Sequence, residues 1–212
     1  YRARDEVTGQ FVTVKRLSAA AMRSEQVRGR FALEAKAAMT IHHPCVVRVL
    51  DFAVLGAERP FIVMESLDGE PLGALLGRCE CLPAELVLQL GRHAAHGLHA
   101  AHCAGVLHRD VKPDNLFLLG PVGAPYGLKL IDFGFAKLLE GSISTDKVVL
   151  GTVQYMAPEQ ILCEAIDARV DVYALGVVLF RMLTGHLPFD AEDGVDLLSH
   201  HILSPVPPLR WL

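Results

Sequence analysis

The chain has 212 residues, with 20 Lys and Arg against 24 Asp and Glu, which gives a formal net charge of −4. Apolar residues make up 51% of the sequence and charged residues 21%, so a disordered tail is excluded and a sizeable core is expected. The acidic balance argues against a dedicated nucleic-acid-binding protein, which usually carries a basic excess.

The sequence shows neither a transmembrane segment nor a secretory signal. Its longest apolar stretch, residues 170–183, is interrupted by Asp171 and Arg181 and is shorter than the roughly 20 residues that span a bilayer. Residues 1–6 are polar and charged, unlike a signal peptide. The five cysteines are an odd number, which indicates reduced thiols. We therefore expect a cytoplasmic location and no membrane contact by this segment, and an anchor outside it stays open.

The first part of the chain is expected to be β-rich with one helix. Residues 1–17 surround a turn and predict a β-hairpin. Apolar residues at helical spacing predict a helix over 24–41. Two further strands are expected over 46–50 and 60–64. Residues 67–71 are rich in turn formers and are expected to connect two lobes.

The second part is expected to be mainly helical. An apolar stripe predicts a helix over 83–105. Short apolar runs at 116–119 and 128–131 predict a second hairpin. Residues 135–156 form an irregular segment, and so long a segment is usually functional or disordered. Residues 170–183 are apolar on nearly every side, which predicts a buried helix.

Three short stretches carry groups suited to chemistry. Residues 108–115, HRDVKPDN, offer a carboxylate, a lysine and an amide on a loop after a helix. The sequence DFG at 132–134 follows an apolar strand, and the Asp oxygen is a hard ligand suited to Mg²⁺. Lys15 on a sheet face and Glu34 on the packed helix could form an ion pair that holds phosphates. Each stretch alone is ordinary. A lysine–glutamate pair on the surface, for example, contributes only about 0–1 kcal/mol to the free energy of unfolding.

The sequence APE at 157–159 closes the irregular segment, and the order of the motifs resembles the signature set of eukaryotic-type (Hanks-type) protein kinases. The resemblance implies an α+β, two-lobed kinase fold. Its small β-rich N-lobe with one helix would span residues 1–66, and its larger, mainly helical C-lobe residues 67–212. Lys112, two residues after Asp110, has the form seen in kinases that transfer the γ-phosphate of ATP to protein Ser/Thr hydroxyls.

The resemblance also implies residue roles. Asp110 would accept the proton of the substrate hydroxyl, Lys112 would neutralise charge on the moving phosphate, and Asn115 and Asp132 would hold Mg²⁺. Three residues would be structural: Arg109, Glu159 and Asp171, the last of which would brace the catalytic loop through backbone hydrogen bonds. ATP would be bound by Lys15, Glu34, Met64, Glu65, Leu67 and Asp132.

Residues of the irregular segment would control activity and contact the substrate. Arg109 directly before Asp110 suggests that a phosphate on this segment orders it by pairing with the guanidinium. Thr152 would line the substrate-hydroxyl site. The candidate phosphorylation sites are Ser142, Ser144 and Thr145. The implied partners are protein substrates with Ser or Thr, together with a second copy of the chain for autophosphorylation.

Some features depart from the family pattern. The chain has 18 glycines but no Gly-x-Gly, so the Gly-rich loop is missing, and we expect truncation at both ends. Thr13 stands where the family usually has Ala, and Pro71 where an acidic ribose contact is common. Asp68 or Glu70 could substitute for that contact.

Other interpretations stay open. A pseudokinase, a scaffold or a catalytically impaired fragment would share the fold, and a small-molecule kinase would share part of the architecture. The run from Tyr155 to Gln160 looks like that of bacterial serine/threonine kinases. Four histidines recur every third residue, which spreads them around a helix and predicts ordinary surface positions. They are His93, His96, His99 and His102.

Overall fold

The computed structural model describes residues 1–16, 25–53, 60–120, 126–133 and 153–209. In the helix that starts at residue 25, the side chains of residues 25–28, 30 and 34 are not described. In the described part, none of the helices has the length and apolarity that a membrane span requires.

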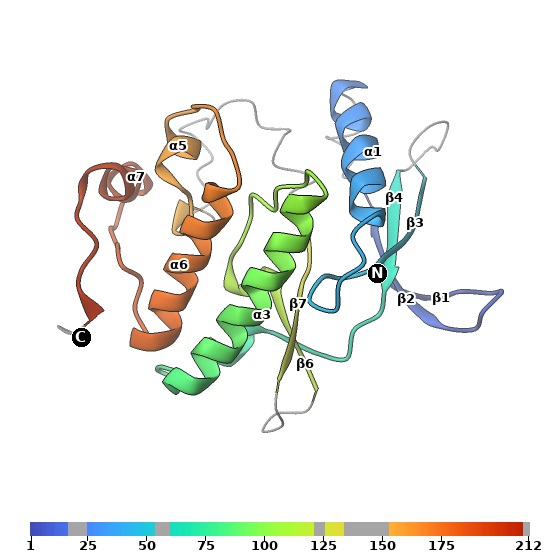
Figure 1. Ribbon diagram of the computed structural model, residues 1–212, viewed down its shortest axis with the longest axis horizontal. Coiled ribbons are helices and arrows are strands. Elements are labelled where there is room, and N and C mark those ends of the chain that lie inside the picture. The colour runs from blue at the N-terminus through green and yellow to red at the C-terminus, as the bar shows by residue number, and fades with distance from the viewer. Residues whose placement is uncertain (17–24, 54–59, 121–125, 134–152, 210–212) are drawn as a thin grey trace.

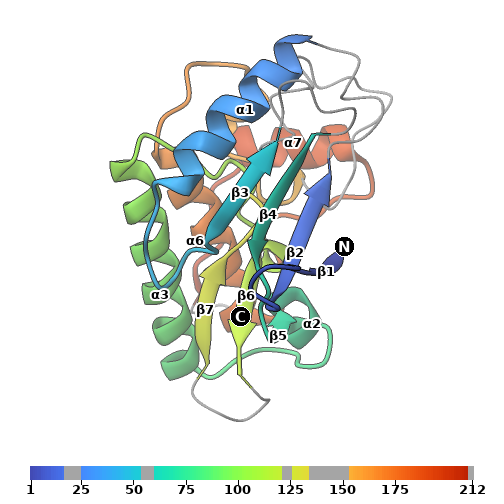
Figure 2. The same cartoon turned by 90° about the vertical axis from the view of Figure 1, so that its right-hand side faces the viewer.

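The first sheet is antiparallel and has the strand order β1-β2-β4-β3. Its strands are β1 (Arg2–Arg4), β2 (Phe11–Arg16), β3 (Val49–Ala53) and β4 (Phe61–Glu65). Helix α1 (Glu25–Met39) lies beside β3 (Figure 2). Val12, Ile62 and Met64 face the core because side chains alternate along a strand. The predicted hairpin, helix and β4 strand are confirmed within a few residues.

The strand predicted over 46–50 is displaced, because β3 begins only at Val49. Val46 and Val47 pair instead with the end of β7 (Gly127–Leu130): the Val47 N–H donates to the Leu130 carbonyl at 2.9 Å. Valine is favourable in any β-strand. The apolar run 46–50 therefore could not show that its first residues pair with one sheet and its last residues with the other. This stretch links the first sheet to the second.

The second sheet has the order β5-β6-β7 and is antiparallel. Strand β6 (Leu116–Leu119) and β7 form the predicted second hairpin. The expected turn-rich connector contains strand β5 (Gly69–Pro71), which adds to the edge of this hairpin. The predicted lobe boundary between residues 66 and 67 lies between β4 and β5 and stays a prediction.

Helices make up most of the rest of the molecule. Helix α3 (Ala84–Cys103) and helix α6 (Arg169–Thr184) lie side by side (Figure 1). Both confirm the prediction, and α6 ends at Gly185, whose φ of 79° is readily accessible only to glycine. Three shorter helices were not predicted. They are α2 (Leu72–Leu76), α5 (Pro158–Ile161) and α7 (Gly194–Leu203).

One large hydrophobic core joins the sheets and helices, with Phe31 of α1, Ile62 of β4, Leu90 of α3 and Leu130 of β7 among its members. A small second cluster of Val153, Phe189 and Leu197 lies under α7. The structure is therefore a small β-rich lobe with one helix and a larger, mainly helical lobe, as predicted.

Candidate active site

The loop after α3 is held at its start by one buried carboxylate. Asp171, in the first turn of α6, is 1% exposed. Its Oδ2 accepts the His108 N–H at 2.8 Å, and its Oδ1 accepts the Arg109 N–H at 2.7 Å. The Nε2 of His102 lies 2.8 Å from the same Oδ2. Three donors thus stabilise a carboxylate whose burial would otherwise be strongly unfavourable.

The contact of His102 was missed by the sequence reasoning, which treated it as one of four surface histidines. His96 and His99 are indeed exposed and His93 is half-buried. His102 instead pairs with Asp171, which is 69 positions further along the chain. No local pattern carries such a signal, because the contact exists only once α3 packs against α6.

His108 ties the start of the loop to the end of β7. Its side chain is fully buried, and its Nε2 lies 3.0 Å from the Ile131 carbonyl. Burial lowers the pKa of His108, so the ring is neutral near pH 7. The Asp110 N–H donates to Nδ1 at 3.3 Å, so Nε2 carries the proton and donates to Ile131. The ring also packs on Phe133, with centroids 4.7 Å apart.

A polar cluster follows within the same loop. Lys112 Nζ lies 3.1 Å from Asp110 Oδ2. A short 3₁₀ turn, η2 (Pro113–Asn115), brings Asn115 back toward Asp110. Asn115 Nδ2 donates to the backbone carbonyl of Asp110 at 2.8 Å and to its Oδ2 at 3.0 Å. The loop thus gathers a carboxylate, an ammonium and an amide at one point.

A second ion pair connects the two sheets at this place. Lys15 of β2 has its Nζ 2.9 Å from Oδ1 of Asp132, which follows β7. The two side chains are 35% and 40% exposed, so the pair adds at most about 1 kcal/mol to stability. Asp132 adopts a left-handed φ of 55°, unusual for a residue other than glycine. A strained residue at such a point more often serves a site than stability.

The segment between β4 and β5 borders the same region. Met64 is buried in β4, and Leu67 packs against the core. Glu65 Oε1 accepts the Arg48 N–H at 2.7 Å and forms an ion pair with Lys129 Nζ. A cavity of about 220 Å³ lies beside this pair. The Glu65 side chain is thus occupied, and the Glu65 N–H donates to the Arg48 carbonyl at 3.0 Å.

For several predicted residues, the structure shows no contact with this loop or ion pair among the residues that it describes. Glu34 lies on α1, but its side chain is not described. Glu159 lies in α5, where its charge acts together with burial to raise the pKa of Tyr173 to about 12, burial being the larger cause. Four more predicted residues lie outside the described part: Ser142, Ser144, Thr145 and Thr152.

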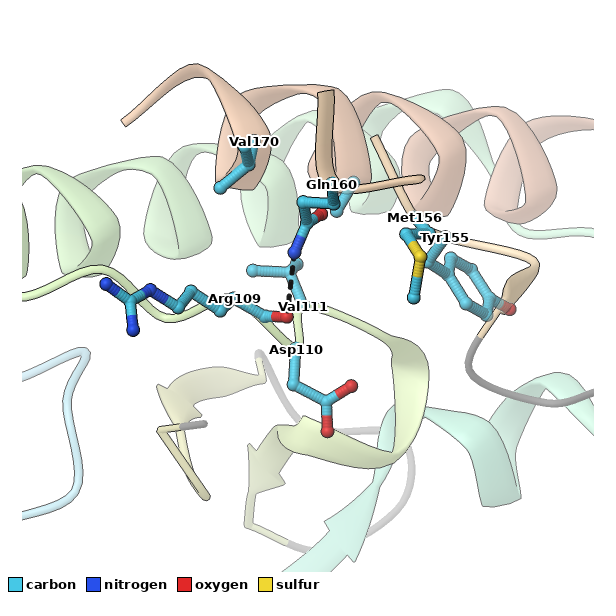
Figure 3. A pocket seen from close by; sticks show the side chains of 8 residues that line it. Arg109, Asp110, Val111, Tyr155, Met156, Gln160 and Val170 are labelled. Atoms are coloured by element: carbon cyan, nitrogen blue, oxygen red, sulfur yellow. Dashed lines mark hydrogen bonds between the residues drawn. The ribbon is translucent and has the colours of Figure 1, made fainter. Parts of the chain in front are cut away.

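A narrow pocket lies between the loop at residues 108–115 and the helices α5 and α6 (Figure 3). Its walls include Asp110 and Tyr155, and the Tyr155 hydroxyl accepts a hydrogen bond from Arg181 Nη1 at 2.6 Å. Burial raises the pKa of Tyr155, so the phenol stays protonated. Gln160 reaches from α5 to the Arg109 carbonyl at 3.5 Å. The sequence reasoning gave no part to Gln160 or Arg181.

A family model described as the protein kinase domain matches residues 1–206. The chain belongs to this family. The serine/threonine-protein kinase Pkn1 of Myxococcus xanthus is 39% identical to it over 94% of this chain and 29% of its own length. PknL of Mycobacterium tuberculosis is 36% identical, over 98% of this chain and 51% of its own length. The resemblance to bacterial serine/threonine kinases is thereby confirmed.

A solved structure agrees on the fold. The chain matches a crystal structure of Rad53 1-466 in complex with AMP-PNP with a TM-score of 0.74 and 26% sequence identity. The match covers 93% of this chain and 47% of that one. The two-lobed kinase fold is confirmed. The chain spans about a third of PknB of Mycobacterium leprae, to which it is 35% identical, so it corresponds to one part of these relatives.

Proposed function

We propose that this chain is the catalytic part of a serine/threonine protein kinase, which transfers the γ-phosphate of ATP to Ser and Thr hydroxyls of proteins. One observation supports this most: Lys15 of the first sheet meets Asp132, which follows the last strand of the second sheet, beside the loop that holds Asp110, Lys112 and Asn115. The family membership and the serine/threonine kinases among the relatives agree with it.

The side chains fit a magnesium–nucleotide complex by their chemistry. Both hydrogen bonds of the Asn115 side chain use its nitrogen, so its oxygen faces away from Asp110. That oxygen and the half-exposed Asp132 carboxylate are the hard ligands that Mg²⁺ takes. Lys15 would hold phosphates, and Met64 and the backbone of Glu65 and Leu67 would border the adenine. ATP with Mg²⁺, when bound, supplies the phosphoryl group and neutralises its charge.

The loop would orient and deprotonate the substrate. Asp110 would accept the hydroxyl proton, and its carboxylate is already oriented by Lys112 and Asn115. Lys112 would also stabilise charge that develops on the phosphoryl oxygens. Asp171 would keep the loop in place through its two backbone hydrogen bonds. Phosphoryl transfer depends mainly on positioning and charge, which these groups provide.

The remaining assignments belong to the same proposal. Glu34 would pair with Lys15, and Thr152 would line the acceptor site. Arg109 would bind a phosphate on the segment before α5, and Glu159 would anchor that segment. The phosphate would be carried by Ser142, Ser144 or Thr145. The partners would be protein substrates and a second copy of the chain, in a cytoplasmic setting that suits the five free cysteines.

The test is incorporation of labelled phosphate from ATP and Mg²⁺ into a basic protein mixture, with an aminoglycoside as the alternative acceptor. Asp110→Asn should lower the rate about 10²–10⁴-fold, because it removes a general base. Asp196→Asn, an exposed position in α7, should leave the rate unchanged. A rate in Asp110→Asn equal to that of the unmodified chain would support the pseudokinase interpretation instead. Faster labelling of the aminoglycoside would indicate a small-molecule kinase.

A further inference from the structure

The peptide that precedes Asp110 has an unfavourable conformation. Arg109 has a φ of 60°, in the left-handed region that a residue with a Cβ rarely adopts. Such a conformation persists only where the surroundings hold it. On one side the Arg109 N–H donates to Asp171 Oδ1 at 2.7 Å. On the other side, the N–H of the Arg109–Asp110 peptide donates to His108 Nδ1 at 3.3 Å, and its carbonyl oxygen is the second group of that peptide that a neighbouring element can hold.

Gln160 provides a restraint from a different element. Its Nε2 lies 3.5 Å from the Arg109 carbonyl oxygen, and its Oε1 accepts the Ala157 N–H at 3.1 Å. Figure 3 shows the side chain reaching from α5 to the loop, with the bond drawn to the Arg109 carbonyl. Because both ends of one planar amide are used, the nitrogen is fixed toward the loop and the oxygen toward the start of α5.

We propose that Gln160 is a positioning residue that fixes the Arg109–Asp110 peptide and thereby the position of Asp110 in the loop, while Lys112 and Asn115 orient its carboxylate. The inference rests on the proposed function, in which Asp110 is the base. Gln160 belongs to α5, which comes shortly after residues 134–152 in the chain. A displacement of α5 would therefore reach Asp110 through one side chain.

The competing explanation is that Gln160 only caps α5 by accepting the Ala157 N–H. Gln160→Glu separates the two. It keeps an oxygen for Ala157, and an acidic residue in the first turn is favourable to a helix. Its second oxygen cannot donate and would face the Arg109 carbonyl, so the restraint is lost. Gln160→Met has similar length and loses both bonds.

A matched control lies elsewhere in the same lobe. Gln89 of α3 is also half-buried, and its Nε2 donates to the Tyr126 carbonyl at 3.0 Å. Gln89→Glu makes the same chemical change without touching the loop at residues 108–115. It should leave kcat unchanged.

The experiment measures kcat, the KM for ATP and the KM for a protein substrate, together with amide hydrogen exchange over residues 106–115. For Gln160→Glu we expect kcat to fall on the order of 10-fold, because a small misplacement of a reacting group is costly. The KM for ATP should stay unchanged, and exchange at Arg109 and Asp110 should become faster. Gln160→Met should show the same two changes and tests the inference if the Glu variant does not fold.

The outcomes separate this inference from the proposed function. If Asp110→Asn is as active as the unmodified chain, the proposed function fails, and the exchange data alone decide whether Gln160 holds the loop. If the unmodified chain depends on Asp110 and Gln160→Glu matches it in kcat and exchange, Gln160 is only a helix cap and the inference is overturned. An equal loss of kcat in Gln89→Glu would also overturn it.

Discussion

Asp171 shows how a single buried charge can keep a strained loop in place. A carboxylate at 1% exposure is strongly unfavourable unless its oxygens are satisfied, and three donors do this: two loop N–H groups and the His102 ring. The same bonds stabilise the left-handed Arg109. Loop and anchor therefore depend on each other, and neither would be stable alone.

Asp171→Asn is expected to lower the free energy of unfolding by about 2–4 kcal/mol, because one oxygen becomes an NH₂ group that faces an N–H donor. Urea unfolding checks this. Asp167→Asn is the matched control, since Asp167 forms an exposed pair with Arg169 at 2.9 Å and should cost less than about 1 kcal/mol. Similar losses in both variants would mean that the buried bonds do not carry the stability assigned to them.

At the scale of single residues, the sequence could predict those that sit next to a turn or a strand end. Asp110, Asn115 and Asp132 are predicted site residues at such positions, and the structure places Asp132 beside Lys15 and Asn115 beside Asp110. His102 and Gln160 could not be found, because their partners belong to elements far along the chain. Their contacts depend on how helices pack, which residue spacing does not report.

Helices and strands could be predicted where the spacing of apolar residues stayed regular along the whole element. They could not be predicted where neighbouring residues of one apolar run pair with different sheets. The α3 stripe and the α6 run each bury one continuous surface, so the helical period was visible in both. Strand β3 was displaced because Val46 and Val47 are apolar for a different reason, namely their contact with β7. Strand β5 lacks an apolar pattern, since its residues are fixed by pairing along β6.

Helix α3 packs closely against its surroundings at Gly97. A Cβ there would lie 2.7 Å from the Cys45 carbonyl oxygen and 2.9 Å from a Leu130 methyl. The oxygen cannot easily move, because it accepts the Leu130 N–H at 2.8 Å. Gly97→Ala should therefore lower the free energy of unfolding by about 1–3 kcal/mol through overpacking.

Gly176 of α6 is the matched control for this change. It is exposed, and a Cβ there would meet nothing within 4 Å. Gly176→Ala should raise the free energy of unfolding by about 1 kcal/mol, because alanine favours a helix over glycine. Urea unfolding of both variants measures the difference. Equal stabilities for the two variants would contradict the packing assigned to Gly97.

For the whole molecule, the sequence predicted a β-rich part and a mainly helical part, but it did not predict the contacts between them. The junction includes the Val47–Leu130 hydrogen bond, the Glu65–Lys129 ion pair and the Lys15–Asp132 ion pair. Each joins residues that lie far apart along the chain, so no local pattern contains it. The candidate site lies at this junction, which explains why motifs could suggest candidate residues without showing their geometry.

Histidines that are fully or partly buried should make the stability of the whole molecule depend on pH. Burial is the main cause that lowers the pKa of His43, His93, His108 and His201. In the unfolded chain each binds a proton near pH 6.5, whereas in the folded chain each does so only at lower pH. Below about pH 6.5 the unfolded state therefore holds more protons, and folding stability decreases as the pH falls.

Urea unfolding between pH 7.5 and 5.5 should show this decrease, with each such histidine adding up to about 1.4 kcal/mol per pH unit. His201 faces the Tyr173 hydroxyl at 2.8 Å and the neighbouring His200. His201→Gln should make the dependence on pH shallower, because it removes a ring whose pKa burial lowers. A stability that stays constant or rises on acidification would show that these rings gain their protons without unfolding.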